Sequence, residues 1–156
     1  MSNASRTGLL ASGALLVVGA LLHIATIFGG PAWYAFLGAP AGLVAMAESG
    51  SLRPAISCVV IAAILLICAA YAFSGAGVIR RLPAARAVLA VVGLGLLIRG
   101  LMFPPLVAWQ PALLIGICGR CQSVNMFVIV TSALCLLVGA GLIIGVMRMP
   151  ATKAGG

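Results

Sequence analysis

The chain has 156 residues, of which 64% are hydrophobic and 6% are charged, and its formal net charge is +8. Soluble globular domains carry about 25% charged residues, so this composition excludes an ordinary soluble domain and predicts an integral membrane protein. In a soluble protein the positive charge would suggest nucleic acid binding. Here the basic residues stand at the ends of apolar runs, which is typical of membrane topology, and we expect no nucleic acid partner.

Four apolar runs are long enough to cross a membrane as helices, because a span needs roughly 20 residues. We predict spans at residues 9–28, 55–79, 87–103 and 126–147. Backbone groups in lipid must be hydrogen-bonded within their own segment, and no strand-like alternation is present, so helices are expected throughout. The sequence therefore predicts an all-α, polytopic membrane protein, a single domain built as a bundle of four transmembrane helices.

Glycine and proline residues mark the expected ends of these helices. Pro54 and Pro83 fit the first turns of the second and third spans, Gly29–Gly30 would end the first span, and Pro104–Pro105 would end the third. A secretory signal is the alternative for the first run, but that run is longer than the usual core of about 7 to 15 residues. We expect it to be retained as a spanning helix.

The basic residues predict an orientation. Six of them fall on one side of the membrane: Arg6, Arg80, Arg81, Arg86, Arg148 and Lys153. Only Arg53 and Arg120 fall on the other side. By the positive-inside rule, the loop 80–86, the flexible tail 149–156 and both termini are expected in the cytoplasm of a bacterium, with the chain in its inner membrane.

The two longer connections, residues 29–54 and 104–125, then face outward. They are too apolar to lie in water and too short to cross the membrane, so we expect short interfacial helices there, anchored by Trp33, Tyr34 and Trp109. Such segments either cover a ligand site or simply pack against the bundle and anchor it.

Polar residues near the outer ends of the spans form a candidate ligand site. His23 and Arg99 are expected at similar depth, about 6 to 8 Å below the outer ends of their helices. With Glu48, the one acidic side chain of the sequence, and with Trp33 and Tyr34, they are the expected ligand-binding residues. Thr26, Ser57 and Cys58 are expected in the same layer.

Structural alternatives exist for both ionisable residues in this layer. Arg99 would snorkel to the headgroups or pair with Glu48, and His23 would donate one hydrogen bond inside the bundle. A haem or metal at His23 would need a ligand of another type, because the sequence has no second histidine.

Cys118 and Cys121 form a C-x-x-C motif in the second outer loop and are the candidate catalytic residues. An oxidising compartment and the neighbouring Arg120 would both favour redox chemistry. The motif resembles that of membrane thiol oxidoreductases of the DsbB and vitamin K epoxide reductase type, which implies electron transfer to a quinone. Those families carry a second cysteine pair in an outer loop, and residues 29–53 contain no cysteine. A structural disulfide and, with Cys58, a soft-metal site are the alternatives.

Gly141 and Gly145 form a G-x-x-x-G motif on the fourth span. Small residues at this spacing let helices approach closely, so this face is a candidate surface for a second copy or for a larger membrane complex. With one acidic side chain, paired-carboxylate catalysis, a Ser-His-Asp triad and a proton-coupled four-helix transporter are disfavoured.

Motifs along residues 20–135 resemble a set of bacterial four-helix inner-membrane proteins without an assigned activity. They are Gly-Gly-Pro-Ala-Trp-Tyr from Gly29, Ser74-Gly-Ala-Gly-Val-Ile-Arg-Arg-Leu-Pro83 and Arg99-Gly-Leu. The resemblance implies a location and a topology and carries over no catalytic residue. We therefore expect a non-enzymatic membrane component, either a subunit of a larger complex or a binder of lipid or quinone. A periplasm-facing thiol-disulfide oxidoreductase and a small-solute transporter or channel are the alternatives.

Overall fold

The structure is a computed structural model that describes residues 3–114, 118, 121, 123–124 and 126–149. Its helices are α1 (Asn3–Phe36), α2 (Ala41–Glu48), α3 (Arg53–Gly75), α4 (Ala85–Trp109), α5 (Pro111–Leu114) and α6 (Met126–Met147). The helices α1, α3, α4 and α6 are long and apolar enough to cross a membrane, and the described residues include no strand. The predicted fold class, an all-α membrane protein with four candidate spans, is confirmed.

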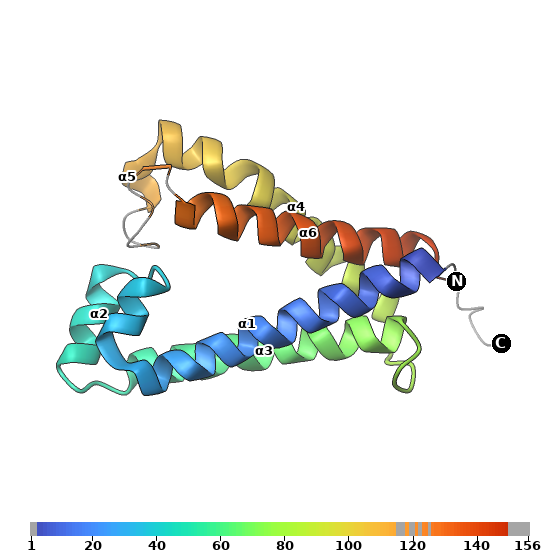
Figure 1. The fold of residues 1–156 in the computed structure, drawn as a ribbon, viewed down its shortest axis with the longest axis horizontal. Helices are drawn as coiled ribbons and strands as arrows, with labels where there is room; N and C mark the ends of the chain where they lie inside the picture. The colour runs from blue at the N-terminus through green and yellow to red at the C-terminus, as the bar shows by residue number, and fades with distance from the viewer. Residues whose placement is uncertain (1–2, 115–117, 119–120, 122, 125, 150–156) are drawn as a thin grey trace.

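The four long helices form two antiparallel pairs (Figure 1). α1 packs mainly on α3, and α4 packs mainly on α6. The pairs meet near the end of the molecule that holds the chain termini and diverge toward the opposite end, where α2 and α5 lie. α1 also contacts α6, and α3 contacts α4, so the two pairs form one bundle.

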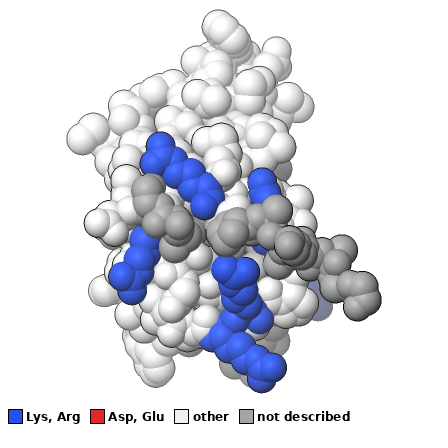
Figure 2. Space-filling view, turned by 90° about the vertical axis from the view of Figure 1, so that its right-hand side faces the viewer, with Lys and Arg blue, Asp and Glu red and all other residues white. Residues whose placement is uncertain are grey.

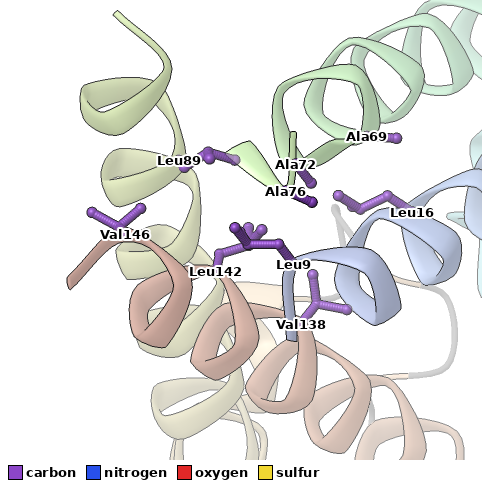
Figure 3. Close-up of a cluster of buried hydrophobic side chains, with 9 residues drawn as sticks. All are labelled: Leu9, Leu16, Ala69, Ala72, Ala76, Leu89, Val138, Leu142 and Val146. Carbon is purple, nitrogen blue, oxygen red and sulfur yellow. The ribbon is translucent and has the colours of Figure 1, made fainter. Parts of the chain in front are cut away.

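The main apolar core lies where the two pairs meet (Figure 3). It consists of Leu9, Leu16, Ala69, Ala72, Ala76, Leu89, Val138, Leu142 and Val146, drawn from all four long helices. Small residues bring α1 and α6 together there: a Cβ on Gly8 would lie 3.4 Å from the Gly141 carbonyl oxygen, and the Ser12 hydroxyl donates to the Val138 carbonyl at 3.1 Å. A tertiary hydrogen bond is worth more where no water competes for the donor.

The Gly141 and Gly145 face is occupied within the chain. Gly141 lies against Gly8 and Ser12, and Gly145 lies against the buried side chain of Leu9. The motif brings two helices together as small residues do in membranes, but its partner is α1 of the same molecule. A second copy could use this face only by displacing α1.

Two expected helix ends are wrong. α4 continues through Pro104 and Pro105 as far as Trp109, although each proline removes an N–H bond and crowds the preceding turn, because proline has a helical φ and Val107 packs in an apolar cluster beyond it. The same helix begins at Ala85, so Pro83 precedes it. Ala84, at φ 52°, makes the turn into α4.

The expected break of the first helix at Gly29–Gly30 is confirmed. Within α1, Gly30 has a non-helical conformation with φ 67°, the chain bends there, and a second, short helical stretch runs from Pro31 to Phe36. A positive φ is accessible to glycine at little cost, whereas a side chain would strain this position. The bend, followed by α2, supplies the short helices that were expected in the first outer loop.

The basic residues gather at the end where the pairs meet (Figure 2). Arg6 lies near the start of α1, Arg80 and Arg81 lie between α3 and α4, Arg86 lies in the first turn of α4, and Arg148 follows α6. Figure 2 shows no acidic side chain on this face, and Glu48 lies at the far end of the bundle. Lys153 and Arg120 lie outside the described residues.

Candidate functional site

A cavity of about 440 Å³ lies between α1, α2 and α3, at the end of the bundle opposite Arg6, Arg80, Arg81, Arg86 and Arg148. Its size falls in the range of about 300 to 1,000 Å³ that is usual for small-molecule sites. Residues from the three helices and from the turn before α2 line it: His23, Thr26, Tyr34, Leu37, Gly38, Ala39, Pro40, Leu43, Pro54, Ser57, Cys58 and Ile61.

Helical spacing places one wall of the cavity on α3. Pro54, Ser57, Cys58 and Ile61 recur at intervals of three and four residues, which puts them on one face of the helix. The facing wall comes from α1, where His23 and Thr26 are one turn apart.

The bend at Gly30 supplies a third wall. The chain turns there, and the buried Tyr34 hydroxyl reaches the thiol of Cys58 on α3 and donates a hydrogen bond to it. Gly38, at φ 78°, then turns the chain into α2. Its missing side chain leaves room for the ring of Phe127 from α6. Two glycines with positive φ thus shape this end of the site.

Three polar side chains of the cavity, those of His23, Thr26 and Ser57, have already donated a hydrogen to a backbone carbonyl. His23 Nδ1 lies 2.8 Å from the carbonyl oxygen of Gly19, and because a carbonyl only accepts, this nitrogen carries the proton. The Thr26 hydroxyl donates to Leu22 O at 2.7 Å, and the Ser57 hydroxyl donates to Arg53 O at 3.0 Å. The oxygen lone pairs of the two hydroxyl groups remain as acceptors, and Nε2 is an acceptor when the imidazole carries a single proton.

Two of the expected ligand-binding residues, His23 and Tyr34, line this cavity, and three do not. Trp33 is 44% exposed, and its ring lies against Gly29 rather than in the cavity. Glu48 is exposed at the last residue of α2.

Arg99 belongs to the other helix pair. Its guanidinium carbon lies 3.3 Å from the centroid of the Phe103 ring, one turn along α4, and it interacts electrostatically with Cys135 on α6. Its Nη1 is buried and has no hydrogen-bond partner. Neither Arg99 nor Glu48 takes part in an ion pair in the part of the chain that the structure describes. The cation–π contact offsets part of the cost of burying this charge.

Cys118 and Cys121 form a disulfide. Cys121 is fully buried in an apolar cluster at the end of α4 and the start of α6, formed with Phe103, Val107, Leu114 and Val128, and Cys118 packs against that cluster. Cys58 lies in the other helix pair, where its buried thiol forms no disulfide and is hydrogen-bonded to Tyr34. Of the two disulfide sulfurs, that of Cys121 is thus enclosed by apolar side chains, whereas Cys118 is half-buried.

Several cavity residues were not expected at the site. Leu37, Leu43 and Ile61 supply apolar walls, and the one signal available from sequence was the spacing of Pro54, Ser57, Cys58 and Ile61 along α3. No group of three or more His, Cys, Asp or Glu side chains that could hold a metal occurs in the described ranges.

No protein-family model, curated protein or solved structure matches the chain. The chemistry of the cavity therefore carries the functional argument.

Proposed function

We propose that this protein is a non-enzymatic membrane component that binds a lipid-like small molecule in the cavity between α1, α2 and α3. The observation that carries the proposal is a set of hydrogen-bond acceptors in a pocket with mainly apolar walls: His23, Thr26 and Ser57 have each given a hydrogen to a backbone carbonyl. A buried acceptor left without a donor is costly, so the favoured ligand supplies hydroxyl hydrogens.

The acceptor-rich lining narrows the ligand class. A lipid alcohol or the reduced, dihydroxy form of a quinone carries hydroxyl donors, whereas an oxidised quinone offers only carbonyl acceptors. The apolar walls from Leu37, Leu43 and Ile61 suit a ring or an alkyl chain. We therefore favour a hydroxyl-bearing amphiphile over an oxidised quinone.

The gathered basic residues support an orientation with the chain termini in the cytoplasm and the cavity near the outer leaflet of a bacterial inner membrane. In that orientation α2 covers the cavity from the outer interface. The burial of Cys121 supports a structural rather than a catalytic role for the Cys118–Cys121 disulfide.

A matched pair of probes tests the ligand class. A decyl-substituted hydroquinone has two hydroxyl donors, and its dimethyl ether has the same skeleton and none. Binding of each to the purified protein in mild detergent is followed by equilibrium dialysis, and we expect the hydroquinone to bind at least about tenfold more tightly. Equal binding of the two probes contradicts the proposal.

A matched pair of variants tests the location. Thr26 and Thr131 both donate to the carbonyl four residues earlier, but only Thr26 lines the cavity. Thr26→Val should weaken hydroquinone binding, and Thr131→Val should leave it unchanged. Mass spectrometry of lipids retained through purification should show the same contrast for the natural ligand. If hydroquinone binding falls in both variants, or in neither, the ligand binds elsewhere.

A further inference from the structure

A second cavity, of about 330 Å³, lies at the opposite end of the bundle, where the α3–α4 connection meets the end of α6. It is lined by Ser74, Gly75, Gly77, Arg81, Leu82, Pro83, Ala84, Ala85, Arg86 and Met149. Two of these residues carry guanidinium groups, and none carries a negative charge. The first cavity, by contrast, is lined by hydrogen-bond acceptors, and its lining includes no arginine or lysine.

The connection that carries Arg81 is held in place from within the bundle. Ser74 is 2% exposed, and its hydroxyl donates to Arg80 O at 3.2 Å and accepts from the Leu82 backbone N–H at 2.8 Å. One buried hydroxyl thus fixes the backbone on both sides of Arg81. The chain then turns at Ala84 and begins α4, which carries Arg86 in its first turn.

Within the described residues, no carboxylate neutralises these arginines. The one acidic side chain of the sequence, Glu48, lies at the far end of the bundle. Figure 2 shows basic side chains and no acidic ones on this face. The paired N–H groups of an arginine guanidinium match the oxygens of a phosphate group. The first backbone N–H groups of α4 have no capping side chain and add further hydrogen-bond donors.

From this arrangement we infer that the cavity binds a phosphate group through Arg81 and Arg86, carried either by a membrane lipid or by a soluble anion. This site is separate from the cavity that binds the amphiphile, and it takes a ligand of opposite hydrogen-bonding character. General attraction of a basic surface to anionic lipid is the competing explanation, and it does not depend on which arginines supply the charge.

The test compares two double variants of the full chain that remove the same charge from the same end. Arg81→Gln with Arg86→Gln removes both cavity groups, whereas Arg6→Gln with Arg80→Gln removes two arginine side chains outside it. Each protein is placed in phosphatidylcholine nanodiscs with a trace of spin-labelled phosphatidate or of spin-labelled phosphatidylcholine. The immobilised fraction of each label gives the preference for the phosphomonoester headgroup.

We expect the wild-type protein to immobilise phosphatidate in preference to phosphatidylcholine. The variant without Arg81 and Arg86 should lose about tenfold more of that preference than the control variant. Equal losses in the two variants, or no preference in the wild type, overturn the inference. Competition by inorganic phosphate at constant ionic strength then identifies the source. Displacement of the label indicates a soluble phosphate ligand, and retention indicates a lipid headgroup; either result depends on the same two arginines.

Discussion

Close packing of α4 on α6 predicts that the glycines of these helices differ sharply in their tolerance of one methyl group. Gly139 is buried, and a Cβ there would lie 2.9 Å from the Gly93 carbonyl oxygen and 3.1 Å from the Leu97 backbone nitrogen. Both atoms are backbone, so the helices must separate to admit the methyl group. Gly95 is exposed on α4, and a Cβ there meets nothing within 4 Å.

The magnitude follows from two opposing terms. Overpacking costs about 1 to 3 kcal/mol, and replacing a helical glycine by alanine returns up to about 1 kcal/mol. Because the contact is between backbones, we take the upper end of the range and expect Gly139→Ala to lower the free energy of unfolding by about 2 kcal/mol. Gly95→Ala, which gains only the helix term, should raise that free energy by about 0.5 to 1 kcal/mol.

Equilibrium unfolding in mixed micelles of mild detergent and dodecyl sulfate measures both variants on one scale. Tryptophan fluorescence from Trp33 and Trp109 reports the transition. Equal midpoints for Gly139→Ala and Gly95→Ala would refute the close approach of the two helices.

Three further predictions use the same titration. Replacing Cys118 and Cys121 together by serine should lower the free energy of unfolding by about 2 kcal/mol, because the four-residue ring no longer restricts the unfolded chain; an unchanged midpoint would show that the disulfide contributes nothing to stability. Arg99→Met should raise the free energy of unfolding by about 1 kcal/mol, because it removes a guanidinium whose Nη1 is buried without a partner, and a marked loss would reveal a partner. Gly38→Ala should lower the free energy of unfolding by about 2 kcal/mol, because this residue has φ 78° and lies against the Phe127 ring. An unchanged midpoint would argue against the turn at Gly38.

The sequence predicts the helices of this fold well because lipid leaves the backbone few alternatives. Length and composition were enough to predict four long apolar helices. The grouping of arginines at one end of the bundle followed from their positions between the apolar runs of the sequence. The limits of the helices were less predictable. Pro104 and Pro105 are strong stop signals locally, but Phe103 and Val107 on either side of them are buried in one apolar cluster, and this packing carries the helix onward.

The candidate site was harder to predict than the fold, because depth along a helix does not determine which neighbour a residue faces. His23 and Arg99 were expected in one layer from their distance to the helix ends. The structure puts His23 on the cavity of the α1 and α3 pair and stacks Arg99 on Phe103 in the other pair. Tyr34 reaches the cavity only because the chain bends at Gly30. The glycine pair signals a break in the helix but not its direction.

The divergence of the helix pairs has a mechanical consequence. At about 1.5 Å per residue, about 22 Å of α6 separates Gly141, where the pairs touch, from Met126 at the far tip. The fit of small side chains where the two helix pairs touch therefore sets how far apart the pairs lie at their other ends. At the tips the ring of Phe127 lies against Gly38, which lines the cavity between α1, α2 and α3. The width of that cavity is thus coupled to atoms about four helical turns away from it.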